Sequence, residues 1–251
     1  MTRLLRFGAL LLALTGMLGT PSLPAAADQF TAAQRAEIIA IVRDALKNDP
    51  SILRDAVTTL QADESARQAA DTHNAIDANR DTLVTAADPV AGNPHGDVTI
   101  VEFFDTRCPY CRRMEPVMTQ FLTQDHGVRL VYKDLPILGP ASVLGSKALL
   151  AAQKQNGYDK LRDAVMRLPP DTTADMIKTA AEKLGLDWPR LSHDMDDPAV
   201  QQRIDANLKL AHALDIQGTP ALVVGDTVIP GAVDLADLKK VVAEARKPTQ
   251  Q

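Results

Sequence analysis

The only two cysteines of the chain, Cys108 and Cys111, are separated by Pro109 and Tyr110. An apolar run of β-branched and aromatic residues precedes the pair and a helical pattern follows it, so we expect Cys108 at a helix N-terminus. Unpaired backbone N–H groups and the helix dipole stabilise a thiolate there. We therefore expect Cys108 to attack a substrate sulfur, and the more buried Cys111 to resolve the mixed disulfide.

Two other uses of the cysteine pair are open. A permanent disulfide across so short a loop would stabilise the fold very little, because it barely restricts the unfolded chain. A metal site needs further ligands, and the histidines have no recognisable ligand spacing to the pair. Two thiolates alone would favour Cu(I) at Cys108 and Cys111. We favour a redox-active Cys108–Cys111 disulfide and expect no other cofactor.

A carboxylate lies in the apolar strand that leads to the pair. Glu102 is six residues before Cys108, and a charge in such a strand needs a reason. We expect a buried Glu102 with a raised pKa that accepts the proton of Cys111, with Lys133 of the neighbouring strand as its ion partner. The alternatives are a purely structural Glu102–Lys133 pair or an edge residue that faces solvent.

A second motif, Gly218-Thr219-Pro220, directly precedes the apolar run 221–224. Proline is tolerated at the first residue of a strand. A cis peptide bond at Pro220 would leave the backbone of Thr219 free to pair with an extended substrate.

The remaining patterns position these motifs in an α/β domain. Two buried strands, 98–104 and 128–132, flank a helix over 109–122 that we expect to be kinked at Pro116, which predicts a parallel βαβ unit. A helical block of four or five helices follows. Short strands at 221–224 and 227–229 and a helix over 235–246 close the chain. The turn-rich segment 88–97 predicts a linker, with a domain boundary near Ala91.

Residues 1–27 have the pattern of a cleavable secretory signal peptide. Arg3 and Arg6 precede an uncharged apolar run, 7–18, which is too short to span a membrane. We therefore expect an exported protein in an oxidising compartment, where a thiol pair is structural or redox-active. The net charge of −5 and the lack of a long basic run argue against nucleic-acid binding.

Residues 28–90 predict a helical arm and linker. From Gln29 to about Ala87 the sequence contains no glycine, and it shows two helices that meet at Asn48-Asp49-Pro50, the second continuing to about Val84. Apolar residues are concentrated in the first helix and at the start of the second. We expect this part to self-associate and hold catalytic domains apart; the alternative is a helix pair that folds back on its own domain.

Taken together, the motifs resemble the DsbA family of the thioredoxin fold. The shared features are Glu102-Phe103-Phe104, the Cys-Pro-Tyr-Cys pair, Pro116, Gly218-Thr219-Pro220 and a helical block between the motifs. The arm and the phrase at 133–140 are similar to the ScsC and Com1-like group. The resemblance implies a DsbA-like thioredoxin domain over 91–251 with a helical insertion at about 139–214, preceded by an N-terminal α-helical oligomerisation arm.

The resemblance also implies residue roles. Cys108 would be the nucleophile, Cys111 the resolving thiol, and Pro109 and Tyr110 the residues that tune the pair. Thr219 and Pro220 would form the cis-proline substrate contact, and Glu102 would be the buried carboxylate. Tyr110 stands where the best-known oxidases of the family have histidine, which implies a less oxidising couple.

The implied function is periplasmic thiol–disulfide oxidoreduction, most of all isomerisation of wrong disulfides in exported proteins. Relatives of the ScsC kind form oligomers, often trimers, are tied to copper tolerance, and are kept reduced by a membrane partner. We therefore expect a homo-oligomer, misfolded exported clients and a DsbD- or ScsB-like reductase. One alternative is a monomeric DsbA-like dithiol oxidase with a DsbB-like partner. The other is a copper-binding protein of a copper-tolerance system.

Overall fold

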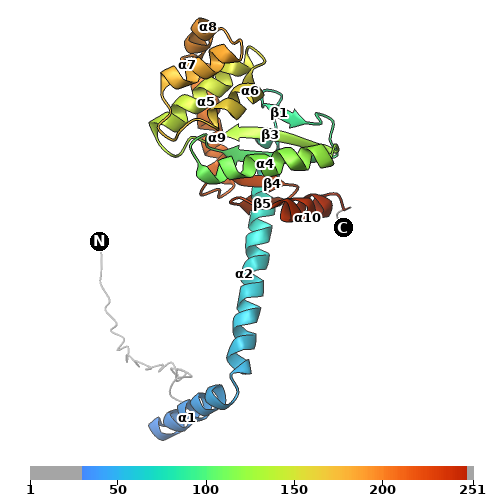
Figure 1. Cartoon of the computed structure of the whole chain (residues 1–251). Helices are drawn as coiled ribbons and strands as arrows, with labels where there is room; N and C mark the ends of the chain where they lie inside the picture. Colours follow the sequence, from blue (N-terminus) through green and yellow to red (C-terminus); the bar gives the residue numbers. More distant parts are fainter. Residues whose placement is uncertain (1–29, 248–251) are drawn as a thin grey trace, which may run out of the picture. The chain divides into compact units, whose positions relative to one another are not determined.

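The computed structural model describes residues 30–247 (Figure 1). The chain divides after Gln61 into two compact units. The predicted signal peptide, residues 1–27, lies outside the described residues. Within those residues, the structure contains no helix that is both long enough and apolar enough to cross a membrane.

The first unit is helical. Helix α1 spans Ala32–Asn48 and begins at a capping box, in which the side chains of Thr31 and Gln34 each accept a hydrogen bond from the other's backbone N–H. Helix α2 spans Ser51–Ala78 and therefore starts in this unit; the Asp49 carboxylate accepts a 3.0 Å hydrogen bond from the Ser51 N–H at its start. No residue of α1 is buried.

The apolar residues of the first unit are exposed. Ten of the fifteen large apolar side chains that are exposed in the described chain lie between residues 30 and 60. We call them the exposed apolar set: Phe30, Ile38, Ile39, Ile41, Val42, Leu46, Ile52, Leu53, Val57 and Leu60. Four of them, Ile38, Ile39, Val42 and Leu46, line one surface hollow, and a concentration of exposed apolar side chains marks an interaction site.

The second unit is built on a five-stranded sheet. The strands are β1 (Val90–Gly92), β2 (Val98–Phe104), β3 (Val128–Asp134), β4 (Ala221–Val224) and β5 (Thr227–Pro230), in the order β1-β3-β2-β4-β5. Strands β2 and β3 are parallel, as the predicted βαβ unit requires, and the other neighbours are antiparallel. The carboxyl end of β2 leads into α4, which carries the cysteine pair.

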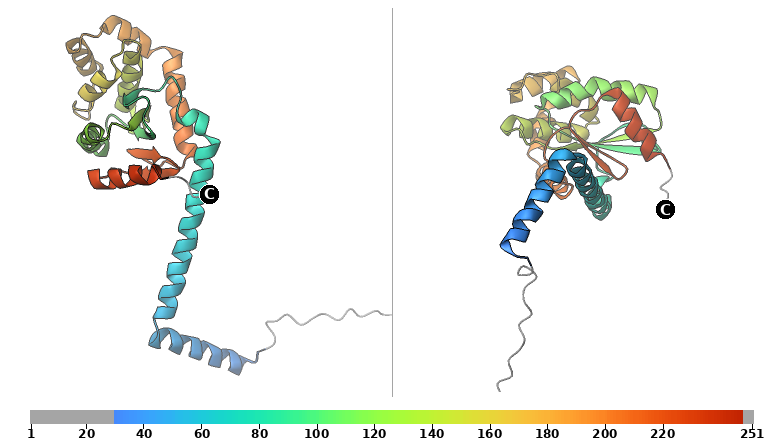
Figure 2. Two further views of the ribbon diagram at one scale, coloured as in Figure 1. Left: turned by 90° about the vertical axis from the view of Figure 1, so that its right-hand side faces the viewer. Right: turned by 90° about the horizontal axis from the view of Figure 1, so that it is seen from below.

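Besides the C-terminal part of α2, the described part of the second unit contains eight helices. They are α3 (Arg80–Leu83), α4 (Pro109–Gln124), α5 (Pro140–Gln153), α6 (Tyr158–Val165), α7 (Ala174–Lys183), α8 (Trp188–Met195), α9 (Pro198–Ala213) and α10 (Leu235–Ala245). Helices α5 to α9 form the insertion between β3 and β4. Figure 2 shows the insertion helices α5 to α8 gathered at one end of the sheet.

The alternation of side chains along β2 divides the core into two faces. Ile100 and Phe104 pack on one face with α4, α10 and the insertion. Val101 and Phe103 pack on the other face with α9, α3 and the end of α2. Side chains two residues apart on a strand point to the same face, so the Glu102 side chain lies with Ile100 and Phe104 on the face that α4 covers.

Two expectations about the segment before the sheet are corrected. Helix α2 ends at Ala78, not near Val84, because the Asn79 amide bonds back to the Ala75 carbonyl oxygen over 2.8 Å and a separate short helix, α3, follows. The segment expected as a linker around Ala91 contains the edge strand β1, which pairs with β3. Only three residues long, this strand owes its place to that pairing rather than to its own pattern.

Candidate active site

The cysteine pair lies where the sequence places it, at the start of a helix. Cys108 is the N-cap of α4, and Pro109 occupies the first turn, where a missing N–H costs no hydrogen bond. Both cysteines are present as free thiols; Cys108 is 4% exposed and Cys111 is fully buried. Burial raises the pKa of the Cys111 thiol, and nearby Cys108 and Glu102 raise it further. Cys111 must therefore lose its proton to a nearby acceptor before it can attack.

The second motif lies directly against the first. The Thr219–Pro220 peptide bond is cis, and the Cys108 thiol donates a hydrogen bond to the Thr219 carbonyl oxygen over 3.1 Å. These two residues are 111 positions apart in the chain. The fold thus brings together the residues that both motifs supply, Cys108, Thr219 and Pro220.

A groove of about 400 Å³ adjoins this pair of motifs. Its walls come from the Tyr110 side of α4, the segment before β4, strand β5 and the part of α2 in the second unit. The lining includes Tyr110, Leu214, Ile216, Thr219, Pro220, Val228 and Pro230. This mostly apolar lining suits an extended peptide segment next to Cys108.

Glu102 is buried as predicted, but its partner is not Lys133. Strands β2 and β3 place Glu102 beside Tyr132, and Lys133 beside Phe103, so the two charged side chains point to opposite faces of the sheet. The Lys133 ammonium instead donates to the Asp88 carboxylate over 2.7 Å. The expected Glu102–Lys133 ion pair is therefore wrong, and the reason is strand register.

The cation near Glu102 is Arg162 of α6, which sequence reasoning missed. A guanidinium nitrogen of Arg162 lies 3.6 Å from Glu102 Oε2, and the guanidinium stacks on the Tyr132 and Phe104 rings at 4.0 and 4.6 Å. Neither oxygen of Glu102 accepts a hydrogen bond from the described residues. Burial raises the pKa of Glu102 to about 7, against the opposing charge of Arg162.

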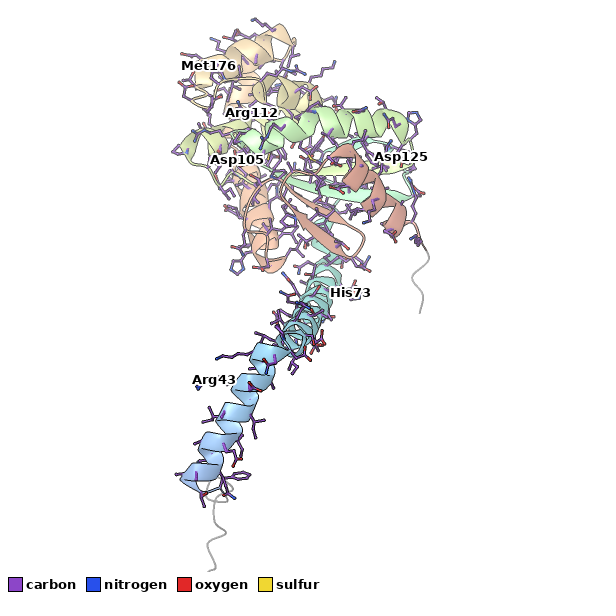
Figure 3. All side chains as sticks on the ribbon, turned by 60° about the horizontal axis from the view of Figure 1, so that its bottom comes forward. Arg43, His73, Asp105, Arg112, Asp125 and Met176 are labelled. Atoms are coloured by element: carbon purple, nitrogen blue, oxygen red, sulfur yellow. The ribbon has the colours of Figure 1, made fainter. Side chains whose placement is uncertain are left out.

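The loop before α4 is fixed by Asp105, another buried residue that sequence reasoning missed. Its carboxylate accepts hydrogen bonds from the backbone N–H groups of Arg107, Ile137 and Leu138, at 2.8 to 3.0 Å. Arg112 of α4 donates twice to the Thr106 carbonyl oxygen. Figure 3 labels Asp105 and Arg112 at the cysteine end of α4, and Asp125 at its other end.

Replacing the buried acid should change how stability depends on pH. Between about pH 4.5 and 7, folded Glu102 keeps a proton that the unfolded chain has lost, so stability falls as pH rises through this window. Glu102→Gln removes that loss. We expect the reduced variant to match the native protein near pH 4 and to exceed it by up to about 3 kcal/mol above pH 7. Urea unfolding at three pH values measures this, and a difference that does not grow with pH would contradict it.

Tyr110 offers a test of the couple's oxidising strength. Its side chain is 54% exposed, and the Arg113 guanidinium lies 4.4 Å from its ring centre. Tyr110→His should stabilise the Cys108 thiolate of the reduced form. Each tenfold change of the redox equilibrium constant in favour of the dithiol raises the reduction potential of the pair by about 30 mV. We expect a potential at least that much higher, measured in glutathione buffers. An unchanged or lower potential would count against the role of this position.

The sheet order, the helical insertion and the cysteine pair at a helix N-terminus beside a cis-proline define a DsbA-like thioredoxin fold. Residues 99–243 match the family model of the DSBA-like thioredoxin domain, and residues 34–67 match that of the copper resistance protein ScsC N-terminal domain. The chain therefore belongs to the DsbA-like thioredoxin-domain family of thiol–disulfide oxidoreductases and carries an ScsC-type N-terminal domain.

Solved structures agree with this assignment. A thioredoxin-like oxidoreductase from Silicibacter pomeroyi DSS-3 is 41% identical, with a TM-score of 0.66 over 68% of this chain and 99% of that one. A linker-deletion variant of Proteus mirabilis ScsC is 31% identical, with a TM-score of 0.64 over 86% of this chain and 97% of that one. The second match extends into the N-terminal unit.

Curated relatives include far longer proteins. The chain is 28% identical over 160 residues to the Na⁺/H⁺ antiporter NhaA 3 of Salinispora tropica. The alignment covers 63% of this chain and 24% of that antiporter, so the chain spans about a quarter of that relative's length.

Proposed function

We propose that the protein is a periplasmic disulfide isomerase that rearranges wrong disulfides in exported proteins through Cys108 and Cys111. The observation that carries this is the contact between the Cys108 thiol, at the N-cap of α4, and the Thr219 carbonyl oxygen beside the cis-proline. It places the attacking sulfur next to a backbone segment that can pair with an extended client. The groove beside it supplies apolar contacts for that client.

In the proposed reaction, the Cys108 thiolate attacks one sulfur of a client disulfide. A Cys108–client mixed disulfide forms, and the other client sulfur leaves as a thiolate. In isomerisation, a different client thiolate attacks the client sulfur of the mixed disulfide, forms a new client disulfide and releases the Cys108 thiolate. The protein therefore ends the cycle reduced, with no net change in electrons.

Cys111 provides an escape from a stalled mixed disulfide. Its proton passes to Glu102, its sulfur attacks Cys108, and the client leaves as a thiolate while the Cys108–Cys111 disulfide forms. This transfers two electrons to the client. A reductase of the DsbD or ScsB kind must then restore the dithiol, which is the partner we propose.

The exposed apolar set of the first unit supports isomerisation over simple oxidation. Ten exposed apolar side chains within about thirty residues need a partner, and we propose that copies of this chain cover one another there, most simply as a trimer. An assembly presents several Cys108 sites to one misfolded client, which raises their effective concentration. A monomeric DsbA-like oxidase would not need this surface.

Copper binding is the second candidate, because the matched N-terminal domain is described as that of a copper resistance protein. Two thiolates at Cys108 and Cys111 would suit Cu(I), which prefers soft sulfur ligands. Such a function needs no proton acceptor at Glu102.

Trapping of the mixed disulfide tests the proposal. We expect Cys111→Ser to form a covalent adduct with scrambled ribonuclease through Cys108, seen as a summed mass on a non-reducing gel and by mass spectrometry. The matched Cys108→Ser variant should form none. Equal adduct formation by both variants, or by neither, contradicts the proposal. Tight Cu(I) binding with no adduct would favour the copper function.

A further inference from the structure

The buried Glu102 shares its cation with a second acid. Glu115 of α4 accepts two hydrogen bonds from the terminal nitrogens of Arg162, one of them 2.7 Å long. Glu102 receives none and lies 3.6 Å from the same guanidinium. The Arg162 guanidinium therefore makes its bidentate hydrogen-bonded pair with Glu115, although Glu102 is the more deeply buried acid.

The two acids differ in their access to water. Glu102 is fully buried, whereas the Glu115 side chain is 21% exposed. Glu115 lines a surface hollow with Arg112, Pro116 and Met166. Its charge therefore loses less hydration than that of Glu102 would. Arg162 cannot follow either acid freely, because the Tyr132 and Phe104 rings hold its guanidinium.

The groups that face Glu102 come from every neighbouring element. Arg162 lies on α6, Cys111 and Glu115 lie on α4, and Tyr132 lies beside Glu102 on β3. Strand β4 presents the uncharged Leu222. Asp159 of α6 acts on Arg162 rather than on Glu102 directly. Among these groups Arg162 is the one cation, and Glu115 holds it.

We propose that Glu115 and Arg162 form a positioning pair that sets the pH at which the buried Glu102 exchanges its proton with Cys111. This deepens the proposed function, since it rests on Glu102 as the proton acceptor. Glu115 partly neutralises the charge of Arg162 that favours ionised Glu102, and its own negative charge disfavours a second carboxylate nearby. Both effects keep Glu102 protonated to higher pH, and they agree with the direction in which Arg162 and Glu115 act on its pKa.

Glu115→Gln tests this, because it removes the outer charge with almost no change of shape. The Glu102 carboxyl is followed by carbon-13 NMR of the full reduced mature protein from about pH 4 to about pH 9, and Glu102→Gln assigns its signal. We expect the midpoint to fall by about one pH unit, because the like charge of Glu115 is gone and the charge of Arg162 is then no longer neutralised by a second carboxylate. The matched control, Glu182→Gln at an exposed position of α7, should leave it unchanged.

The exchange rate supplies a second readout. In Glu115→Gln, the pH profile of the exchange rate should move to lower pH than in the native protein. The double variant Glu102→Gln/Glu115→Gln should have the same profile as Glu102→Gln alone, because Glu115 acts through Glu102. An unchanged or higher NMR midpoint overturns the proposal, and so does a profile shift that persists in the double variant. Lack of isomerase activity in the native protein would instead overturn the proposed function, since the NMR midpoint does not depend on activity.

Discussion

Cys108→Ser is expected to reduce catalysed disulfide exchange to the background rate, a loss on the order of a thousand-fold or more. A hydroxyl at the N-cap of α4 keeps the local shape and can still donate to the Thr219 carbonyl oxygen. It cannot form the mixed disulfide. Reactivation of scrambled ribonuclease by the reduced protein measures the effect.

The matched variant, Cys111→Ser, separates attack from escape. It keeps the Cys108 thiolate and should retain part of the isomerase activity while it accumulates mixed disulfide with the client. Unfolding in urea checks that both variants are folded. Residual activity of Cys108→Ser close to the native level would mean that exchange does not begin at this sulfur.

Removal of the first unit is expected to change the mass of the assembly in solution from that of an oligomer to that of a monomer. A chain that begins at Ala62 keeps the whole second unit with its two core clusters, so it should fold. It lacks the exposed apolar set. Light scattering during gel filtration measures the mass, and a trimeric 28–251 chain is the result we predict.

A point substitution sharpens this test. Ile39 is 56% exposed and lies in an apolar hollow with Ile38, Val42 and Leu46. Ile39→Asp would bury a charge in the assembly, so it should dissociate the oligomer. Ser65→Asp adds the same charge at an exposed site of α2 outside the exposed apolar set and should leave the mass unchanged. A native chain that is itself monomeric would refute self-association.

The parts of the site that sequence patterns predict are those that local rules govern. A buried strand, two cysteines and a helical pattern place Cys108 at the N-cap, and a proline before a short apolar run places Pro220 directly before β4. That these two points meet is a property of the thioredoxin fold. The expectation that Cys108 and Pro220 lie together came from the family resemblance, because no local sequence pattern predicts it.

The parts that were missed depend on contacts that a pattern does not encode. Arg162 lies 60 positions from Glu102, on a short helix whose spacing would suit a surface arginine equally well. Its burial depends on how the insertion packs against the sheet. The Glu102–Lys133 pair failed because parallel strands pair in a register that sets these residues on opposite faces.

The most direct test of the account compares the reduced 28–251 chain with the chain that begins at Ala62 in reactivating scrambled ribonuclease. We predict that the longer chain reactivates it at least about tenfold faster per Cys108 site, since several sites act on one client. After oxidation to the Cys108–Cys111 disulfide, both chains should oxidise a reduced peptide equally well. Equal reactivation by the two chains, or none by either, would contradict an isomerase assembled through the first unit.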